Sequence, residues 1–342
     1  MKTIGTFTSY ELCHSPNHPS KSVQGLIDGL AECGFRNGTH YKITMSHSNR
    51  LEDHYRTMCD WFAAGRVDIL FCGGTPIAWV IRQAISKLGS QAPLIYFGAH
   101  PIDGSHEVGM TQVAGPDTVC VRMQLPLTFH YRTFRILRLL FPRLERVHIP
   151  FARNTVFCHP AMARRYDSHR TIFGPYAWIE SDMVGFKSIK DLCWVIDATY
   201  REYPLHSSEE LRKALNTILP RGDGEIVRDI IVAFNDTYHV EGAPATLLQF
   251  STISRVPVVW VNNAAMARHG AIADFCNPFE SVAKQAAAYV AEYLSGRWTP
   301  GRYECIWNDS IHYTLNRKTA SILGIPQLRW DQVERSFHQV IR

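Results

Sequence analysis

The sequence lacks the patterns that mark several common classes of protein. No apolar run reaches the length of a membrane-spanning helix. Neither a G-x-G-x-x-G fingerprint nor a phosphate-loop lysine motif occurs, which argues against nucleotide chemistry. The nine cysteines form no C-x-x-C pair, and their odd number favours free thiols in a reducing compartment over a disulfide framework.

The amino-terminal residues bear on the compartment. Met1 to Thr3 lead directly into a strand-like run, Ile4 to Thr8, without the positive and apolar regions of a secretory signal. We therefore expect a cytoplasmic protein, or a periplasmic or lipid-anchored one if a precursor signal has been trimmed. Four cysteines in apolar contexts are expected to be small buried side chains: Cys33, Cys59, Cys72 and Cys193.

Composition and charge are those of a globular chain long enough for two domains. Of the 342 residues, 46% are hydrophobic and 20% are charged, and the net charge is +5 with histidine neutral. The basic residues are dispersed except for one cluster with helix-like spacing: Arg132, Arg135, Arg138, Arg143 and Arg146. We interpret this cluster as a solvated helix face, because no nucleic-acid motif accompanies it. We expect neither nucleic acid nor a membrane as a partner.

One stretch, Val67 to Leu88, carries the clearest pattern. A buried apolar strand ends in two glycines, Thr75 takes the position of a helix N-cap, and Pro76 takes the first helical position. Apolar residues follow at helical spacing: Ile77, Val80, Ile81, Ala84, Ile85 and Leu88. A helix N-terminus that follows a strand of an open α/β sheet suits an anion. A tight connection that merely needs glycine gives the same pattern, and both interpretations stay open.

Strand and helix alternate along most of the chain. In the first part we expect strands at 4–8, 41–45, 69–72, 93–97 and 119–123, and helices at 22–33, 49–64, 76–88 and 126–141. In the second part we expect strands at 146–150, 193–199, 229–234, 256–261 and 270–275, an extended segment at 303–314, and helices at 155–166, 208–218, 245–254, 281–294 and 331–341. This order predicts an α/β protein of two doubly wound, Rossmann-like lobes. The expected lobes are 1–120, to which part of 300–342 returns, and 121–300.

Four segments carry a resemblance to a known family: Gly25–Phe35, Val67–Pro76, Gly270–Gln285 and Asn316–Ile325. In order and spacing they resemble the ABC-transporter substrate-binding proteins that bind small solutes, tryptophan and tyrosine among them. Val67–Pro76 is similar to the family's third strand and Thr-Pro turn, and Gly270–Gln285 to its strand-to-helix segment. The resemblance covers nearly the whole chain. It implies a fold like that of the type I periplasmic-binding proteins, with a ligand cleft between two lobes that close by a hinge motion.

By this resemblance, loops at the strand ends line the cleft. The resemblance implies Thr75, Pro76, His100, Arg153, Asn154, Thr155, Asn235, Asp236, Thr237 and Asn262 as ligand-binding residues, and we add Tyr10 and Arg122 from their own residue types. These residue types suit a zwitterion, with a carboxylate at the Thr75 helix terminus and Asp236 as the counter-ion of an ammonium group. An aromatic wall for a flat side chain would come from Tyr10, Phe97, Phe151, Tyr238 and Trp260.

The chain also departs from the family at several positions. Where relatives carry a Ser-Asp pair at the lobe crossover, this chain has Arg122 and Met123. An acid is lost and a guanidinium gained, which favours a more anionic ligand than a plain amino acid. The first loop, 10–19, does not align with the family, and residues 167–190 resemble an insertion. Members of the family are normally exported, which the amino-terminal residues of this chain do not suggest.

Two patterns are compatible with a metal site or a catalytic site, but in both cases a structural interpretation is favoured. His14 and His18 are four residues apart beside a cysteine, but the Ser-Pro-Asn between them prevents the helix that would align them. Cys72 precedes a helix N-terminus, with His100 or His239 as a partner base, yet the spacing matches no known site and a buried cysteine is favoured. We therefore expect no metal and no cofactor.

Other polar residues admit two interpretations. His100 contacts ligand or is structural, Asp236 binds ligand or caps the next helix, and Arg153 is an anion clamp or a surface residue. His47 and His54 are expected on a solvated helix start.

The sequence favours a solute-binding protein without catalytic activity. Its ligand would be an amino-acid-like or aromatic, anionic small molecule, and its partner an ABC-transporter permease if the protein is exported. The alternative is a cytoplasmic enzyme or biosynthetic protein that has recruited the same fold and uses His, Cys and Arg residues of the same cleft, with Cys72, His14 and His100 as the residues to test.

Overall fold

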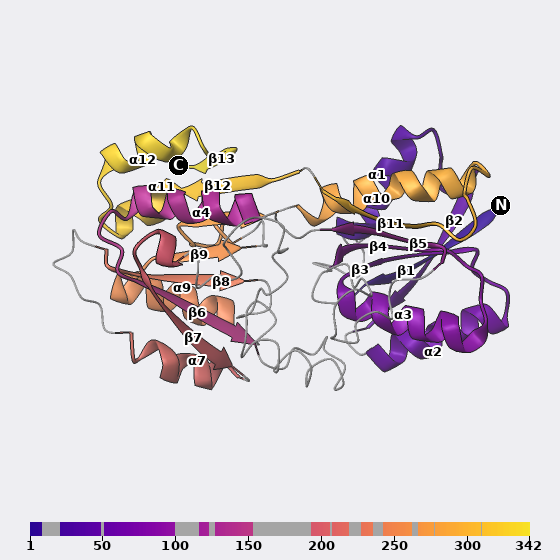
Figure 1. Cartoon of the computed structure of the whole chain (residues 1–342), viewed down its shortest axis with the longest axis horizontal. Helices are drawn as coiled ribbons and strands as arrows, with labels where there is room; N and C mark the ends of the chain where they lie inside the picture. The colour runs from indigo at the N-terminus through magenta and orange to yellow at the C-terminus, as the bar shows by residue number, and fades with distance from the viewer. Residues whose placement is uncertain are drawn as a thin grey trace. The chain divides into compact units, whose positions relative to one another are not determined.

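The computed structural model describes residues 1–8, 21–48, 51–99, 116–122, 127–152, 193–205, 207–218, 227–234, 242–261, 266–276, 278–308 and 310–342. These residues form two compact units, each with its own sheet and apolar core (Figure 1). Residues 1–122 and 279–310 belong to the first unit, and residues 127–152, 193–278 and 311–342 belong to the second.

The first unit is a doubly wound α/β unit whose neighbouring strands are all parallel. In spatial order its six strands are β11 (Tyr303–Trp307), β5 (Thr118–Arg122), β4 (Leu94–Ala99), β3 (Ile69–Gly73), β1 (Lys2–Thr8) and β2 (Tyr41–His47). Helices α1 (Lys21–Glu32) and α10 (Phe279–Leu294) lie on one face of the sheet, and α2 (Leu51–Ala63) and α3 (Thr75–Leu88) lie on the other (Figure 1). The alternation that the sequence predicts for this part of the chain is confirmed.

The strand, turn and helix at 69–88 form as predicted, with a shift at one boundary. β3 is buried along its whole length, and Ile81 and Ala84 of α3 are fully buried. The N-cap is Gly74 rather than Thr75, because the chain reverses there with a φ of 86°, which glycine adopts without steric cost. Leu88, which we expected in the apolar stripe, is 45% exposed at the end of the helix.

Two glycines let α1 and α10 approach each other closely. A Cβ atom on Gly25 would lie 2.3 Å from the carbonyl oxygen of Glu280, and one on Gly29 would lie 2.6 Å from the α10 backbone. The methyl groups of Ala283 and Ala287 face the same positions at 2.9 and 2.7 Å. Small residues on both helices therefore bring α10 onto the sheet of the first unit, although α10 comes late in the sequence.

The second unit has a larger, mixed sheet. In spatial order its seven strands are β13 (Gln339–Ile341), β12 (His312–Asn316), β10 (Ala273–Cys276), β9 (Val258–Val261), β8 (Asp229–Phe234), β6 (Arg146–Ala152) and β7 (Thr199–Leu205). β12 runs antiparallel to β10, and the other neighbours are parallel. Helices α4 (Leu127–Leu140), α11 (Arg317–Ile322) and α12 (Gln327–Glu334) lie on one side of this sheet, and α7 (Ser208–Leu215) and α9 (Ala243–Ser254) lie on the other (Figure 1).

The basic cluster of the sequence divides between a helix face and the core of this unit. Arg132 and Arg135 are exposed on α4, as predicted for a solvated face. Arg138 instead donates a hydrogen bond to the carbonyl oxygen of Leu144, at 2.6 Å. Arg146 opens β6 and forms an ion pair inside the second unit, so the cluster is not one continuous surface.

The structure divides the chain between its units differently from the sequence prediction. We expected residues 121–300 in the second lobe and part of 300–342 back in the first. β11 does return to the first unit, but α10 belongs there as well, and residues 311–342 complete the second unit by adding β12 and β13 to its sheet. The local pattern could not reveal this, because an amphipathic helix is compatible with either core.

Several expected elements have other types or bounds in the structure, because contacts with distant parts of the chain decide them. Residues 193–195 are helical and the strand begins at Thr199, because Cys193 and Ile196, three apart, pack into the core together. The extended segment 303–314 is two strands, β11 and β12, of two different sheets. The expected helix 331–341 ends at Glu334 and is followed by β13, and α7 is capped by Ser207 rather than Ser208.

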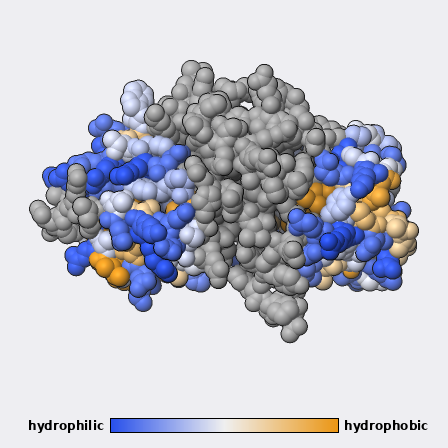
Figure 2. Space-filling model, turned by 90° about the horizontal axis from the view of Figure 1, so that it is seen from below, coloured by the Kyte–Doolittle hydropathy of each residue, from blue (hydrophilic) through white to orange (hydrophobic). Residues whose placement is uncertain are grey.

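Both units present hydrophilic side chains to the surface together with smaller hydrophobic areas (Figure 2). The large apolar side chains that are exposed include Trp194 at 79% and Ile253 at 75%. Within the described part of the chain, no helix is long and apolar enough to cross a membrane.

Candidate functional site

Those expected binding residues of the first unit that the structure describes lie at one edge of its sheet. Parallel strands end at the same edge, and β4 has β3 and β5 as its neighbours while β1 pairs with β3. Thr75 and Pro76 open α3 directly after β3, and Arg122 is the last residue of β5. Tyr10 and His100 lie outside the described residues, just after the ends of β1 and β4 in the sequence. The topology therefore brings Thr75, Pro76 and Arg122 to the carboxyl edge, and the places of Tyr10 and His100 there stay a prediction.

The second unit repeats this arrangement at three adjacent strands. β8 lies between β6 and β9, and all three run parallel. The expected residues that directly follow these strands are Arg153, Asn154 and Thr155 after β6, Asn235, Asp236 and Thr237 after β8, and Asn262 after β9. All seven lie outside the described residues, so their side chains remain a prediction.

The amino end of α3 has the chemistry of an anion site. The N–H of Gly74 donates to the carbonyl oxygen of Phe97 at 2.8 Å, which ties the turn to β4. A Cβ atom on Gly73 would meet the ring of Phe279 at 2.8 Å, so the turn is tightly packed from behind. The N–H groups of the first turn of a helix lack partners within the helix and carry a partial positive charge. A carboxylate is the kind of group that such a terminus can bind.

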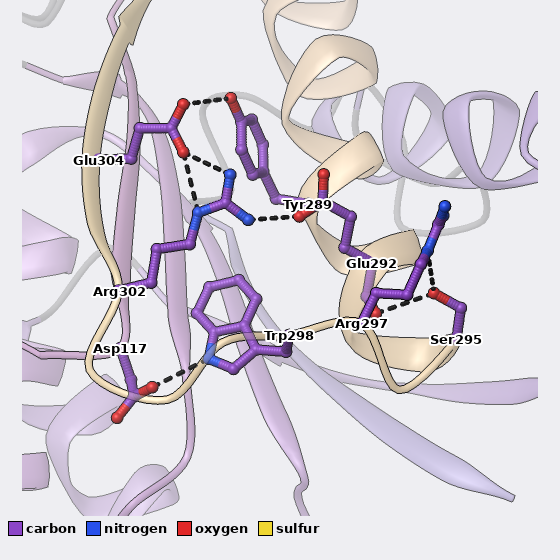
Figure 3. Close-up of polar contacts among 8 residues, drawn as sticks. All are labelled: Asp117, Tyr289, Glu292, Ser295, Arg297, Trp298, Arg302 and Glu304. Atoms are coloured by element: carbon purple, nitrogen blue, oxygen red, sulfur yellow. Dashed lines mark hydrogen bonds and ion pairs between the residues drawn. The ribbon is translucent and has the colours of Figure 1, made fainter.

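The opposite, amino edges of both sheets hold charges that are already paired. In the first unit the guanidinium of Arg302 forms ion pairs with Glu292 and Glu304, and the indole N–H of Trp298 donates to Asp117 at 2.9 Å (Figure 3). This cluster joins the turn before β11 to the turn before β5. Its charges are used for structure, which leaves the carboxyl edge as the better candidate for a ligand.

A second paired cluster lies near the amino end of the second sheet. His148 Nε2 lies 2.8 Å from Asp229 Oδ1, and His148 Nδ1 lies 2.8 Å from the hydroxyl of Tyr203. Arg146 contacts the other oxygen of Asp229 at 2.5 Å. Burial alone would raise the pKa of Asp229, but hydrogen bonds from His148 and Arg146 outweigh it and lower that pKa below its usual value.

The expected aromatic wall is only partly compatible with the structure. Phe97 is fully buried between the rings of Phe71 and Phe279, with centroid distances of 4.8 and 5.2 Å. Trp260 is also fully buried, in the core beneath α9. Both belong to apolar cores, because residues inside a buried strand alternate between the two covered faces of the sheet. The side chains of Tyr10, Phe151 and Tyr238 lie outside the described residues.

The burial of Cys72 bears on whether this residue is catalytic or structural. Cys72 is 1% exposed within β3, and burial raises the pKa of its thiol. A buried, protonated thiol is a poor nucleophile, so the structure argues against Cys72 as a catalytic group. Cys193 is buried as expected, whereas Cys33 is exposed and Cys59 is half-buried, contrary to expectation.

His54 is the residue that sequence reasoning misplaced. We expected it on a solvated helix start, but it is 1% exposed and its ring contacts Ser46 and Ser48 at the carboxyl end of β2. Ser46 lies in β2, Ser48 directly follows the strand, and the histidine falls in the first turn of α2, a combination that has no established sequence signature.

The described residues contain no group of three side chains able to hold a metal ion. Cys13, His14 and His18 lie outside them, so the expectation about that loop stays a prediction.

No family model and no curated protein matches the chain. Solved structures do match it. An ABC domain from Streptococcus pneumoniae in complex with L-Trp is 16% identical, with 99% of both chains covered and a TM-score of 0.68. The ligand-free, open form of a substrate-binding protein from Clostridium difficile is 13% identical, with 96% of both chains covered and a TM-score of 0.62.

A LacI-family transcriptional regulator from Bifidobacterium animalis is 15% identical, with 91% of this chain and 95% of that chain covered and a TM-score of 0.57. At these identities the likeness concerns the fold. Together with the two sheets described above, it shows that this chain has the α/β fold of the type I periplasmic-binding proteins, the fold class that the sequence predicted.

Proposed function

We propose that this protein binds a small anionic solute, amino-acid-like or aromatic, at the carboxyl edges of its two sheets and does not transform it. The observation that carries the proposal is that the expected ligand-binding residues stand at or directly after the ends of adjacent parallel strands in both units. Ligands of open α/β sheets bind at such edges. A solute that contacts both edges would favour a closed arrangement of the lobes, since it makes both sets of contacts only there.

The residue types at the edges suggest how the solute is oriented. Thr75 at the amino end of α3 and Arg122 at the end of β5 would bind its anionic groups. Asp236, which follows β8, would bind an ammonium group. The L-Trp in the Streptococcus domain of the same fold supports an amino-acid-like ligand. If the protein is exported, we expect an ABC-transporter permease as its partner.

The first test is mass spectrometry of the small molecules released when the purified protein is denatured. One intact metabolite, in an amount close to one per chain, supports the proposal and names the ligand. Two chemically related species, or a covalent adduct on the chain, would favour the enzyme alternative instead.

A second test compares matched substitutions at the two ends of the strands, with the released metabolite as the titrant. Arg122→Gln and Asp236→Asn are each expected to weaken its binding at least tenfold, because each removes a charged partner. The control is Asp68→Asn, which lies directly before β3 at the amino edge, and it should bind normally. Unchanged affinity in both edge variants would show that the carboxyl edges are not the binding site.

A further inference from the structure

His54 contacts the carboxyl end of β2 through both nitrogens of its ring. Nε2 lies 2.9 Å from the carbonyl oxygen of Ser48, and Nδ1 lies 2.9 Å from the hydroxyl oxygen of Ser46. A carbonyl oxygen can only accept, so Nε2 carries a proton. A serine hydroxyl can donate or accept, and when the Ser46 hydroxyl donates to Nδ1 the imidazole is uncharged.

The surroundings of the ring stabilise a charge poorly. His54 is 1% exposed, and the ring of Phe7 on β1 meets it edge-on at a centroid distance of 5.7 Å. Among the described residues, Asp53 on α2 would favour a charged ring and His47 on β2 would disfavour it. The Asp53 carboxylate also accepts a hydrogen bond from the hydroxyl of Ser48 at 2.8 Å. Burial dominates these effects and lowers the pKa of His54.

This cluster lies at the edge where the candidate site is located. His47, the last residue of β2, pairs with Thr8, the last residue of β1. The strand that precedes Tyr10 therefore ends beside the segment that His54 anchors. A change in the packing of that segment would act directly on the carboxyl edge of the first sheet.

We propose that His54 is a pH-sensitive latch, which in its uncharged form holds the end of β2 against the first turn of α2 and on protonation releases both. A proton on Nδ1 forces the Ser46 hydroxyl to direct its own hydrogen elsewhere, and it leaves a cation against the Phe7 ring. The segment opens because the charge is better solvated in water. This latch goes beyond the proposed function, since it does not depend on what the edge binds.

The size of the expected effect follows from proton linkage. In the opened segment His54 titrates like an ordinary histidine, with a pKa of about 6.5. Opening is then favoured by up to about tenfold more at pH 5.5 than at pH 7.5, the full factor applying if the closed ring stays uncharged throughout. The contribution of the latch to stability is thus complete above the ordinary pKa of histidine and is lost as the pH falls below it.

Hydrogen exchange of the full chain tests the latch directly. Peptides covering 41–48 and 51–58 are compared at pH 5.5 and 7.5 after correction for the intrinsic exchange rate. We expect the wild type to lose protection in acid, by up to about tenfold. His54→Gln keeps a donor and an acceptor but does not titrate, so its protection should not depend on pH. His47→Gln, the adjacent histidine, should behave like the wild type.

Two results would overturn the latch: protection of the wild type that stays constant over this range, or an acid-induced loss that persists in His54→Gln. If His54→Gln fails to fold, the pKa of His54 is measured instead from the pH titration of its imidazole NMR resonance in the wild type. That resonance is assigned by comparison with Ser46→Ala. A titration midpoint at or above the ordinary value for histidine would then contradict the proposal.

Discussion

In the first unit the helices meet through glycine and alanine, whereas the second unit buries ionisable side chains between its strands. α1 rests on α10 at Gly25 and Gly29, where the α10 backbone occupies the space of a side chain. The second unit instead contains Asp229 paired with His148 and Arg146, and a separate buried carboxylate, Asp274. The first unit thus relies on close backbone contact between helices, and its charge pairs around Arg302 are partly exposed, whereas the second unit buries the carboxylate of its charge pair.

The two buried carboxylates of the second unit show how much the partner matters. Asp229 has two cationic or protonatable partners, and its pKa is lowered. Asp274 is fully buried between β9 and β12, accepts a hydrogen bond from the N–H of Ala267 at 2.8 Å, and has its pKa raised to about 6 because burial dominates. Hydrogen bonds from the neutral donors Ala267 and Thr314 do not offset burial at Asp274, whereas the hydrogen bonds and charges of His148 and Arg146 reverse its effect at Asp229.

The largest expected effect comes from breaking the ion pair of the second unit. Asp229→Ala leaves His148 and Arg146 without their partner, and we expect the second unit to lose about 3–5 kcal/mol in its free energy of unfolding. Because the pKa of Asp229 is lowered, this stability is present above the ordinary pKa of aspartate and disappears as the pH falls through the lowered value. Urea denaturation at several pH values measures both effects.

The control for this change is Glu145→Ala, which removes an exposed ion pair with Arg228 just before β6 and β8. Exposed pairs contribute roughly 0–1 kcal/mol, so this variant should remain near the wild type. Equal losses in both variants would show that burial does not distinguish the two pairs.

A smaller effect of opposite sign is expected at Asp274. In the unfolded chain this carboxyl group has an ordinary pKa of 3.8, and in the folded unit its pKa is about 6, so the folded state binds the proton more tightly. Stability should therefore fall by about 2 kcal/mol as the pH rises from 4 to above 6. Asp274→Asn cannot ionise, and its amide oxygen can still accept from the N–H of Ala267.

The measurement is the difference in unfolding free energy between Asp274→Asn and the wild type across pH 4–7. The variant should gain relative stability as the pH rises. A difference that does not vary with pH would mean that Asp274 is not protonated in the folded unit.

The close contact between α1 and α10 predicts a steric effect in the first unit. Gly25→Ala places a methyl group against the carbonyl oxygen of Glu280, so α1 and α10 must separate. We expect a loss of about 2 kcal/mol in the stability of the first unit, even though alanine favours a helix. Ala31→Ser, on an exposed position of α1, should change stability by less than about 0.5 kcal/mol. Hydrogen exchange can assign the loss, which should be absent from peptides of the second unit.

The smallest expected effect concerns the N-cap of α7, which is Ser207 in the structure and Ser208 in the sequence prediction. The hydroxyl of Ser207 accepts a hydrogen bond from the N–H of Glu210 at 3.3 Å, at the start of α7. Ser207→Ala should cost about 1 kcal/mol, and Ser208→Ala should cost less because Ser208 is already the first helical residue. Thermal unfolding of the two variants decides between the positions, and a greater loss for Ser208→Ala would favour the sequence prediction.

Much of the architecture was predictable because it depends on local patterns. The buried run of β3, the amphipathic face of α4 and the strand β8 all follow from the spacing of apolar residues. The edge positions of the candidate site were predictable too, since a strand must end before a loop can carry polar residues. The chemistry of the site could only be proposed, from residue types and a family resemblance.

The errors lie where distant segments meet. His54 was expected at the surface because its neighbours in the sequence are polar, but Ser46, Ser48 and Phe7 enclose it. Phe97 was expected in a ligand wall, and it packs on Phe279, which is far away in the sequence. No local pattern encodes such contacts.

By itself, the sequence determined the alternation of strands and helices, the α/β class and the chain positions at which polar residues follow strands, because the periodicity of apolar residues records which face of each element is covered. Only the tertiary structure decided which unit receives α10, β11 and β12, which charges are paired, and which histidines are buried. These properties depend on contacts between residues that are far apart in the chain, and such contacts form only when the elements pack.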